Sequence, residues 1–249
     1  MSAHPPVGTP PEGLRTPRLI ALVAALVVLA LLYAAFAARA RPARLLPAPA
    51  AASTATTQGS EQTSVVLAGG CFWGVQAVYQ HTRGVLNAVA GYTGGQASQA
   101  NYAAVSSGST GHAEAVQITY DPRQITLGDI LQIFFSIAHD PTERNRQGPD
   151  VGAQYRSAVF YADNAQRDVA LAYIAQLDAA AVLHAPIATE VVPLATFHRA
   201  ESGHQDYATN NPHALYIATY DAPKLHHLQA LLPQRYRESP VLTDTVGTP

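Results

Sequence analysis

Residues 64–74 read SVVLAGGCFWG, and this stretch decides the fold around it. The apolar run Ser64–Leu67 stops at two glycines, which predicts a short buried strand. Phe72–Gln80 follows with its apolar residues gathered on one face, which predicts a helix. The one cysteine of the chain, Cys71, is therefore expected at a strand-to-helix turn.

Outward from this turn, strands and helices alternate irregularly. A capping-box pattern at Thr126–Asp129 predicts a helix reaching Ala138, and Asp163 is expected to cap a second helix that runs to about Leu183. Alternating or apolar runs predict strands at 85–92, 113–120, 157–161 and 189–193. The predicted fold class is α+β, a mixed β-sheet with helices packed on it in a two-layer sandwich, preceded by one transmembrane helix.

The N-terminal segment differs from the rest. Residues 19–36 form an uninterrupted apolar run flanked by arginines, and a helix of that length, extended to residue 38, crosses a hydrocarbon layer of roughly 30 Å. A cleavable signal peptide would have an apolar core of only about 7–15 residues, and a buried core helix needs no such uniform run. A single-pass signal anchor at 19–38 fits best, with the folded domain outside the cytoplasm. The alternative is an exported soluble protein after signal cleavage.

Composition divides the chain further. Residues 1–18 form a short basic tail, and 39–63 are rich in Pro, Ala, Ser and Thr, which predicts a linker. Residues 64–220 are expected to form the folded domain and 221–249 a C-terminal tail. Ten basic against 16 acidic residues give 61–249 a net charge of −6, so a nucleic-acid partner is not expected. We expect a monomer.

The lone Cys71 has two interpretations. A free cysteine is usually buried and inert. At the first turn of a helix, however, orphan N–H groups and the helix dipole would stabilise a thiolate nucleophile. The neighbouring Phe72 and Trp73 are either core aromatics or the wall of an apolar pocket beside the thiol.

Two further clusters contain chemically useful groups. Glu114 opens the strand at 113–120 among small apolar residues, where burial would raise the pKa of its carboxyl; a water-exposed strand end is the alternative. The polar, glycine-containing loop at 146–157 contains Asp150 and Tyr155, in the kind of segment where functional groups gather. The histidines show no metal-ligand spacing, so no metal is expected.

These segments resemble a known family, the A-type peptide methionine sulfoxide reductases. The likeness runs from about Ser64 to Tyr220 and rests on the motifs GGCFWGV, GYTGG, STGHAEAV, ITYDPRQI, HDPTERNRQGPDVGAQYRSAVFY and AESGHQDY, in that order. It implies an α+β sandwich with its cysteine at the start of a helix. It also implies thiol-dependent reduction of methionine S-sulfoxide, free or protein-bound, in the repair of oxidative damage.

The resemblance assigns a role to each matching position. Cys71 matches the nucleophile that becomes a sulfenic acid, and Glu114 matches the acid. The other matching residues are the tyrosine donors Tyr102 and Tyr155, the water-holding Asp150, and the methyl-group cage of Phe72 and Trp73. No cofactor is implied beyond an external thiol such as thioredoxin or another dithiol.

The sequence departs from the family pattern in three places. Many relatives have a resolving cysteine in the C-terminal tail, and residues 207–249 contain none, so an external thiol is expected to reduce the sulfenic acid. Gln76 replaces a common Glu, and Ala100-Asn101 replaces a common Pro before the matching tyrosine. Two rival functions remain: a Cys–His hydrolase using His112 or His204 as base, and a tethered binding module with an inert Cys71.

Overall fold

The computed structural model describes residues 20–28, 44–50 and 62–243. The folded domain lies in a compact unit that spans Ala43–Pro249. Of the predicted membrane span at 19–38, only residues 20–28 are described, and they are helical. Within the described part of the chain, no helix is both long and apolar enough to cross a bilayer. The rest of the predicted span lies outside the described residues.

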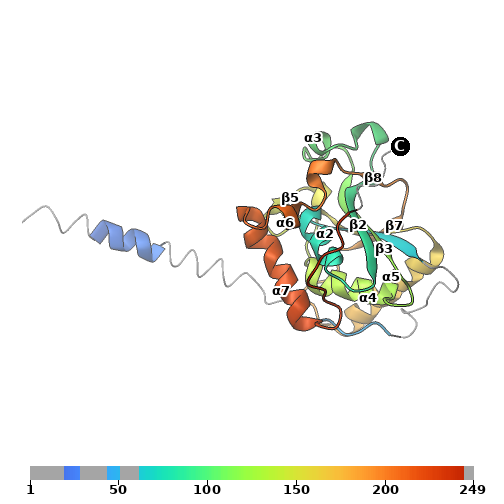
Figure 1. Cartoon of the computed structure of the whole chain (residues 1–249). Helices are drawn as coiled ribbons and strands as arrows, with labels where there is room; N and C mark the ends of the chain where they lie inside the picture. The colour runs from blue at the N-terminus through green and yellow to red at the C-terminus, as the bar shows by residue number, and fades with distance from the viewer. Residues whose placement is uncertain (1–19, 29–43, 51–61, 244–249) are drawn as a thin grey trace, which may run out of the picture. The chain divides into compact units, whose positions relative to one another are not determined.

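A six-stranded sheet forms one layer of the domain (Figure 1). Its strand order is β7-β6-β1-β3-β2-β8, with every neighbouring pair antiparallel except the parallel pair β6 and β7. A separate two-stranded ladder pairs β4 with β5. The strands are β1 Thr63–Gly69, β2 Val85–Thr93, β3 Ala113–Tyr120, β4 Arg146–Gln147, β5 Asp150–Val151, β6 Ser157–Tyr161, β7 Glu190–Pro193 and β8 His198–Arg199.

The longer helices pack on one face of this sheet and share its main core. They are α2 Phe72–Gln80, α4 Leu127–Ile133, α5 Asn164–Ala179 and α7 Ala222–Leu231. A π-helical turn, η3 Phe134–Ala138, continues α4, and a second, η6 Ile217–Asp221, leads into α7. The shorter elements are η2 Ala97–Gln99, α3 Tyr102–Val105, η4 Ala153–Tyr155, η5 Ser202–His204 and α6 Tyr207–Asn210.

Alternation along the strands separates the two faces of the sheet. On β1, Val65 and Leu67 belong to the core beneath the helices, whereas Val66 and Ala68 belong to a smaller cluster on the other face. Because successive side chains of a strand point to opposite faces, both sides of the central strand are buried. The predicted mixed sheet with helices packed on it is confirmed.

Local sequence signals fixed several boundaries. The strands at 113–120 and 157–161 are observed as predicted. Thr126 and Asp129 form the reciprocal capping box, and the Asp163 side chain caps α5. Helix α5 ends at Ala179 rather than near Leu183, and Ala181 beyond it has a left-handed φ of 47°.

Two segments outside the predicted domain limits pack onto the domain. Leu46, from the stretch predicted as linker, is 3% exposed, and its backbone N–H donates to Ser136 Oγ at 3.0 Å. The Tyr173 hydroxyl donates to the Pro47 carbonyl at 2.7 Å. Helix α7 lies in the stretch predicted as C-terminal tail, and its Leu228 is fully buried. The folded domain therefore includes residues on both sides of 64–220.

Candidate active site

Cys71 is the N-cap residue of α2, two residues after the last residue of β1, so it lies at the strand-to-helix turn that the sequence predicts. The two preceding glycines make this sharp turn possible. Gly70 has a left-handed φ of 89°, and a Cβ there would lie 2.6 Å from Gln147. A Cβ at Gly69 would lie 2.8 Å from the ring of Phe134. Since only glycine fits both positions, the GG pair positions the thiol.

The protonation state of Cys71 differs from the expectation. The residue is 9% exposed, and burial raises the pKa of its thiol well above the usual value, with further upward contributions from the charges of Glu114 and Asp221. The backbone N–H of Trp73 and the Lys224 ammonium lower this pKa, but by less. The prediction that the helix terminus holds a thiolate is therefore wrong for the substrate-free protein, because desolvation outweighs the helix N-terminus. The resting group is a thiol.

Glu114 lies on β3 and is 2% exposed, so the expectation of burial is confirmed and the exposed alternative is wrong. Its Oε2 accepts the backbone N–H of Phe72 at 3.1 Å, which places the carboxyl at the first turn of α2. Burial raises the pKa of Glu114 to about 8, and the nearby Asp150 contributes in the same direction. The carboxyl therefore holds a proton at neutral pH.

Two phenols share this electrostatic environment. Tyr102 begins α3, where its backbone N–H donates to Glu201 Oε1 at 2.9 Å, and Tyr155 ends η4. Burial raises the pKa of both phenols, and the charges of Glu114, Cys71 and Asp150 raise them further. Both groups are therefore hydroxyl donors near the thiol at neutral pH.

Asp150 reaches the site from β5 and is held by a residue that the sequence analysis did not single out. Its Oδ2 accepts the hydroxyl of Tyr216, which lies just before η6. Burial raises the pKa of Asp150, while this hydrogen bond and Lys224 lower it. Tyr216 was missed because it lies 61 residues beyond Tyr155, outside any local motif.

Aromatic rings wall the site on one side. Trp73 stacks on Tyr207 with ring centroids 3.9 Å apart and meets Tyr216 edge-on at 6.0 Å. His204 stacks on Tyr102 at 4.2 Å and on Trp73 at 5.9 Å. Phe72 is buried 6.4 Å from Trp73. The sequence left Phe72 and Trp73 open as core aromatics or as a pocket wall. Of the other rings, Tyr102 lies 29 residues from Trp73 in the chain, whereas His204, Tyr207 and Tyr216 lie more than 100 residues away.

In the described part of the chain, neither histidine of the hydrolase alternative forms a hydrogen bond with Cys71. Both ring nitrogens of His112 are engaged: Nδ1 accepts the N–H of Gly95 at 3.2 Å, and Nε2 lies 2.9 Å from the carbonyl of Gln96. His204 stacks within the aromatic wall, and burial lowers its pKa. Among the described residues, no group of three or more His, Cys, Asp or Glu side chains could hold a metal ion.

The fold and the site together define a cysteine enzyme of the α+β class. Its thiol lies at a helix N-terminus, near a protonated carboxyl and two phenols and beside an aromatic wall. Such a site suits a substrate whose reacting atom is attacked by sulfur while a neighbouring oxygen takes up a proton.

Comparisons with known proteins agree with this class. Residues 63–235 match the family model described as peptide methionine sulfoxide reductase. "Peptide methionine sulfoxide reductase MsrA 2" of Mesorhizobium japonicum is 52% identical over 184 residues, covering 74% of this chain and 93% of that protein. The chain belongs to the peptide methionine sulfoxide reductase family, and it reduces methionine sulfoxide in the repair of oxidative damage.

Solved structures support the same assignment. Reduced Mxr1 from Saccharomyces cerevisiae superposes with a TM-score of 0.56 at 33% identity, covering 63% of this chain and 90% of that one. Methionine sulfoxide reductase A of Corynebacterium diphtheriae gives a TM-score of 0.53 at 32% identity, covering 70% and 86%.

Proposed function

We propose that Cys71 reduces the S epimer of methionine sulfoxide, free or in proteins, and becomes a sulfenic acid. Glu114 is the acid, and Tyr102 and Tyr155 donate hydrogen bonds to the sulfoxide oxygen. Asp150 orders water near that oxygen, and Phe72 with Trp73 encloses the substrate methyl group.

The observation that carries this proposal is the buried carboxyl of Glu114 beside the nucleophile turn. Its pKa of about 8 leaves it protonated at neutral pH. A sulfoxide sulfur becomes electrophilic when its oxygen is polarised or protonated, so the enzyme needs a proton donor at that oxygen. Glu114 fits this requirement because its carboxyl touches the Phe72 N–H, one residue from the thiol.

The first half-reaction balances within the site. The Cys71 sulfur attacks the substrate sulfur, and the sulfur–oxygen bond breaks. The substrate sulfur gains two electrons and leaves as the thioether of methionine. The cysteine sulfur loses two electrons, and the oxygen ends as the hydroxyl of Cys71 sulfenic acid. Glu114 gives its proton to the oxygen, and the proton lost by the Cys71 thiol restores the acid form of Glu114 for the next turnover.

The second half-reaction uses an external thiol. The chain has one cysteine, so an internal disulfide cannot form within its 249 residues. An external thiol displaces water from the sulfenic acid and forms a mixed disulfide with Cys71. A second thiol then releases Cys71, and a dithiol such as thioredoxin supplies both from one molecule. No metal or organic cofactor takes part.

A dithiothreitol-coupled assay of the full-length chain on each epimer of a blocked methionine sulfoxide tests this proposal. We expect turnover of the S epimer that requires dithiothreitol. Thiol-independent ester or amide cleavage would favour the hydrolase, and absence of both activities would favour a binding module. A dimedone-type probe should add once per chain after one turnover without reductant.

We also propose that residues 19–38 anchor a monomeric enzyme to a membrane, with its catalytic domain outside the cytoplasm. The support is the uncharged run of 18 residues from Leu19 to Phe36. The full-length chain should fractionate with membranes and keep its N-terminus. Recovery of a soluble form that begins near Ala38 would show instead that the segment is a cleaved signal.

A further inference from the structure

The junction between η6 and α7 places a buried ion pair at the first turn of α2. Asp221 is 2% exposed, and its Oδ1 accepts the Lys224 ammonium at 3.0 Å. The other oxygen, Oδ2, is buried and has no hydrogen-bond partner among the described residues. A buried carboxylate with one ionic partner is costly to maintain, so its location calls for an explanation.

The ion pair packs directly against the backbone of α2 at Gly74, three residues after Cys71. A Cβ at Gly74 would lie 2.0 Å from Asp221 Oδ1 and 2.6 Å from Lys224 Nζ. Since a side chain of any size at this position would displace the pair, Gly74 gives it close access to the turn that carries the thiol.

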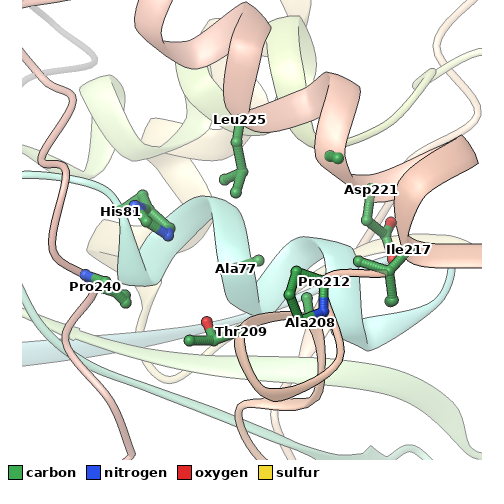
Figure 2. Close-up of a pocket in the computed structure, with 10 residues that line it drawn as sticks. Ala77, His81, Ala208, Thr209, Pro212, Ile217, Asp221, Leu225 and Pro240 are labelled. Carbon is green, nitrogen blue, oxygen red and sulfur yellow. The ribbon is translucent and has the colours of Figure 1, made fainter. Parts of the chain in front are cut away.

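Beyond this contact, a cavity of about 210 Å³ lies beside the two helices, lined by Ala77 of α2 and by Ala222 and Leu225 of α7. Figure 2 shows Leu225 pointing from α7 toward Ala77 of α2, with Asp221 at one side of the space. The lining is mostly apolar, so the Asp221–Lys224 pair is the charged contact at this end of the cavity. The Asp221–Lys224 pair is thus a close contact of the α7 segment with the nucleophile end of α2.

The charges of the pair reach Cys71. Asp221 raises the pKa of the thiol and Lys224 lowers it, alongside the larger effects of burial and of Glu114. Tyr102, Tyr155 and Tyr216 also interact electrostatically with Cys71. Asp221 and Lys224 come from a different segment than Glu114, Tyr102 and Tyr155, and they approach the turn through Gly74.

We propose that the Asp221–Lys224 ion pair is a positioning element of the active site, which fixes the first turn of α2 through Gly74 and sets the charge that faces Cys71. The proposal rests on the proposed role of Cys71 as nucleophile. Its consequence is that the two opposite charges nearly cancel at Cys71, so burial and Glu114 keep the resting thiol protonated and unreactive until a polarised sulfoxide is bound. An enzyme that meets peroxide before substrate gains protection from this arrangement, because the thiolate is the form that oxidises.

The test is the pH dependence of Cys71 alkylation by iodoacetamide in the substrate-free, full-length protein. The chain has one cysteine, so every adduct reports on this thiol. Asp221→Asn should move the alkylation midpoint down by about one pH unit, since it removes a nearby negative charge. Lys224→Gln should move it up. The double variant should return to within about 0.3 unit of the wild type.

The direction in which each variant moves the alkylation midpoint separates a charge effect from loosened packing. Loosened packing would hydrate the thiol and lower the midpoint in both single variants and further in the double variant. That pattern, or a midpoint unmoved by Asp221→Asn, would overturn the proposal. Asp168→Asn is the matched control, because it removes the same charge from an exposed pair with Arg167 and should leave the midpoint unchanged. If Asp221→Asn fails to fold, the alkylation midpoint of Lys224→Gln alone tests the proposal. A downward shift of that midpoint would contradict it.

Alkylation does not require turnover, so the test is independent of the proposed function. If Cys71 were not the nucleophile, Cys71→Ser would keep sulfoxide reductase activity while the alkylation shifts in the other variants stayed as predicted. If the ion pair had no role, Cys71→Ser would be inactive while those shifts were absent.

Discussion

The two halves of helix α2 bury polar groups in opposite ways. In the second half, Gln76 uses both ends of its amide: Nε2 lies within 3.1 Å of three acceptors, and Oε1 accepts the N–H of Asp206 at 2.9 Å. Around the first half, Trp73 Nε1 and Asp221 Oδ2 have no hydrogen-bond partner in the described part of the chain. Apart from the partly exposed Trp73, every residue of both halves is buried, so burial alone does not separate structure from function.

The two halves of α2 differ in whether the buried polar groups around them have hydrogen-bond partners. Buried polar groups in native proteins are nearly always paired, and the exceptions concentrate where a substrate supplies the partner. Glu114 also lies at this end of the helix, where burial raises the pKa of its carboxyl to about 8 despite the hydrogen bond from the Phe72 N–H. The first half of α2 therefore has the features of a reaction site and the second half those of a scaffold.

The largest effect should come from Cys71→Ser. Serine occupies nearly the same volume but cannot attack the sulfoxide sulfur, so we expect complete loss of reduction with an unchanged Tm. The measurement is dithiothreitol-dependent turnover of the S epimer beside a thermal melt. Turnover near the wild-type rate would remove Cys71 from the mechanism.

Glu114→Gln should lower kcat/KM by about 10²–10⁴-fold, the usual size of general acid catalysis. The amide keeps the shape and can accept the Phe72 N–H, which Glu114 accepts at 3.1 Å, but it cannot deliver an acid proton. Steady-state kinetics at pH 7 measure the loss. An unchanged rate would show that Tyr102, Tyr155 or solvent supplies the proton.

The pH profile should show a smaller effect. Burial raises the pKa of Glu114 to about 8, so its active, protonated form predominates below that pH and is lost above it. We expect kcat/KM to fall about tenfold per pH unit above pH 8. Glu114→Gln is the control and should lack this decline. A wild-type profile that stays flat to pH 10 would contradict the assignment of Glu114 as acid.

The sequence predicted best the features that depend on neighbouring residues. The turn at Gly69–Cys71, strands β3 and β6, and the caps at Thr126 and Asp163 follow from local steric and hydrogen-bonding rules. The burial of Glu114 also followed from its small, apolar neighbours on the strand.

The features that depend on distant residues could not be predicted in this way. The pKa of the Cys71 thiol was predicted in the wrong direction, because the helix N-terminus is visible in the sequence while burial beneath other segments is not. Tyr216 and Asp221 approach the site across about 150 residues of chain, in a stretch that contains a π-helical turn and a weakly amphipathic helix. Neither has a periodic apolar pattern strong enough to predict the packing.

The smallest effect on activity should come from Gln76→Ala, which tests the scaffold half of α2. The Ala88 carbonyl would keep the Thr243 hydroxyl at 3.1 Å and Gln205 Oε1 would keep the Ala90 N–H at 3.0 Å, whereas the Asp206 N–H would lose its acceptor. One orphaned, partly buried donor and the lost packing predict a fall of about 2 kcal/mol in the free energy of unfolding. Because Gln76 reaches none of the reacting groups, kcat/KM of the folded fraction should stay near the wild-type value.

Gln229→Ala, on the exposed side of α7, is the matched control and should change neither quantity. A large fall in kcat/KM with unchanged stability would show that the two halves of the helix are not separate in function, since a residue with satisfied hydrogen bonds would then be contributing to the chemistry.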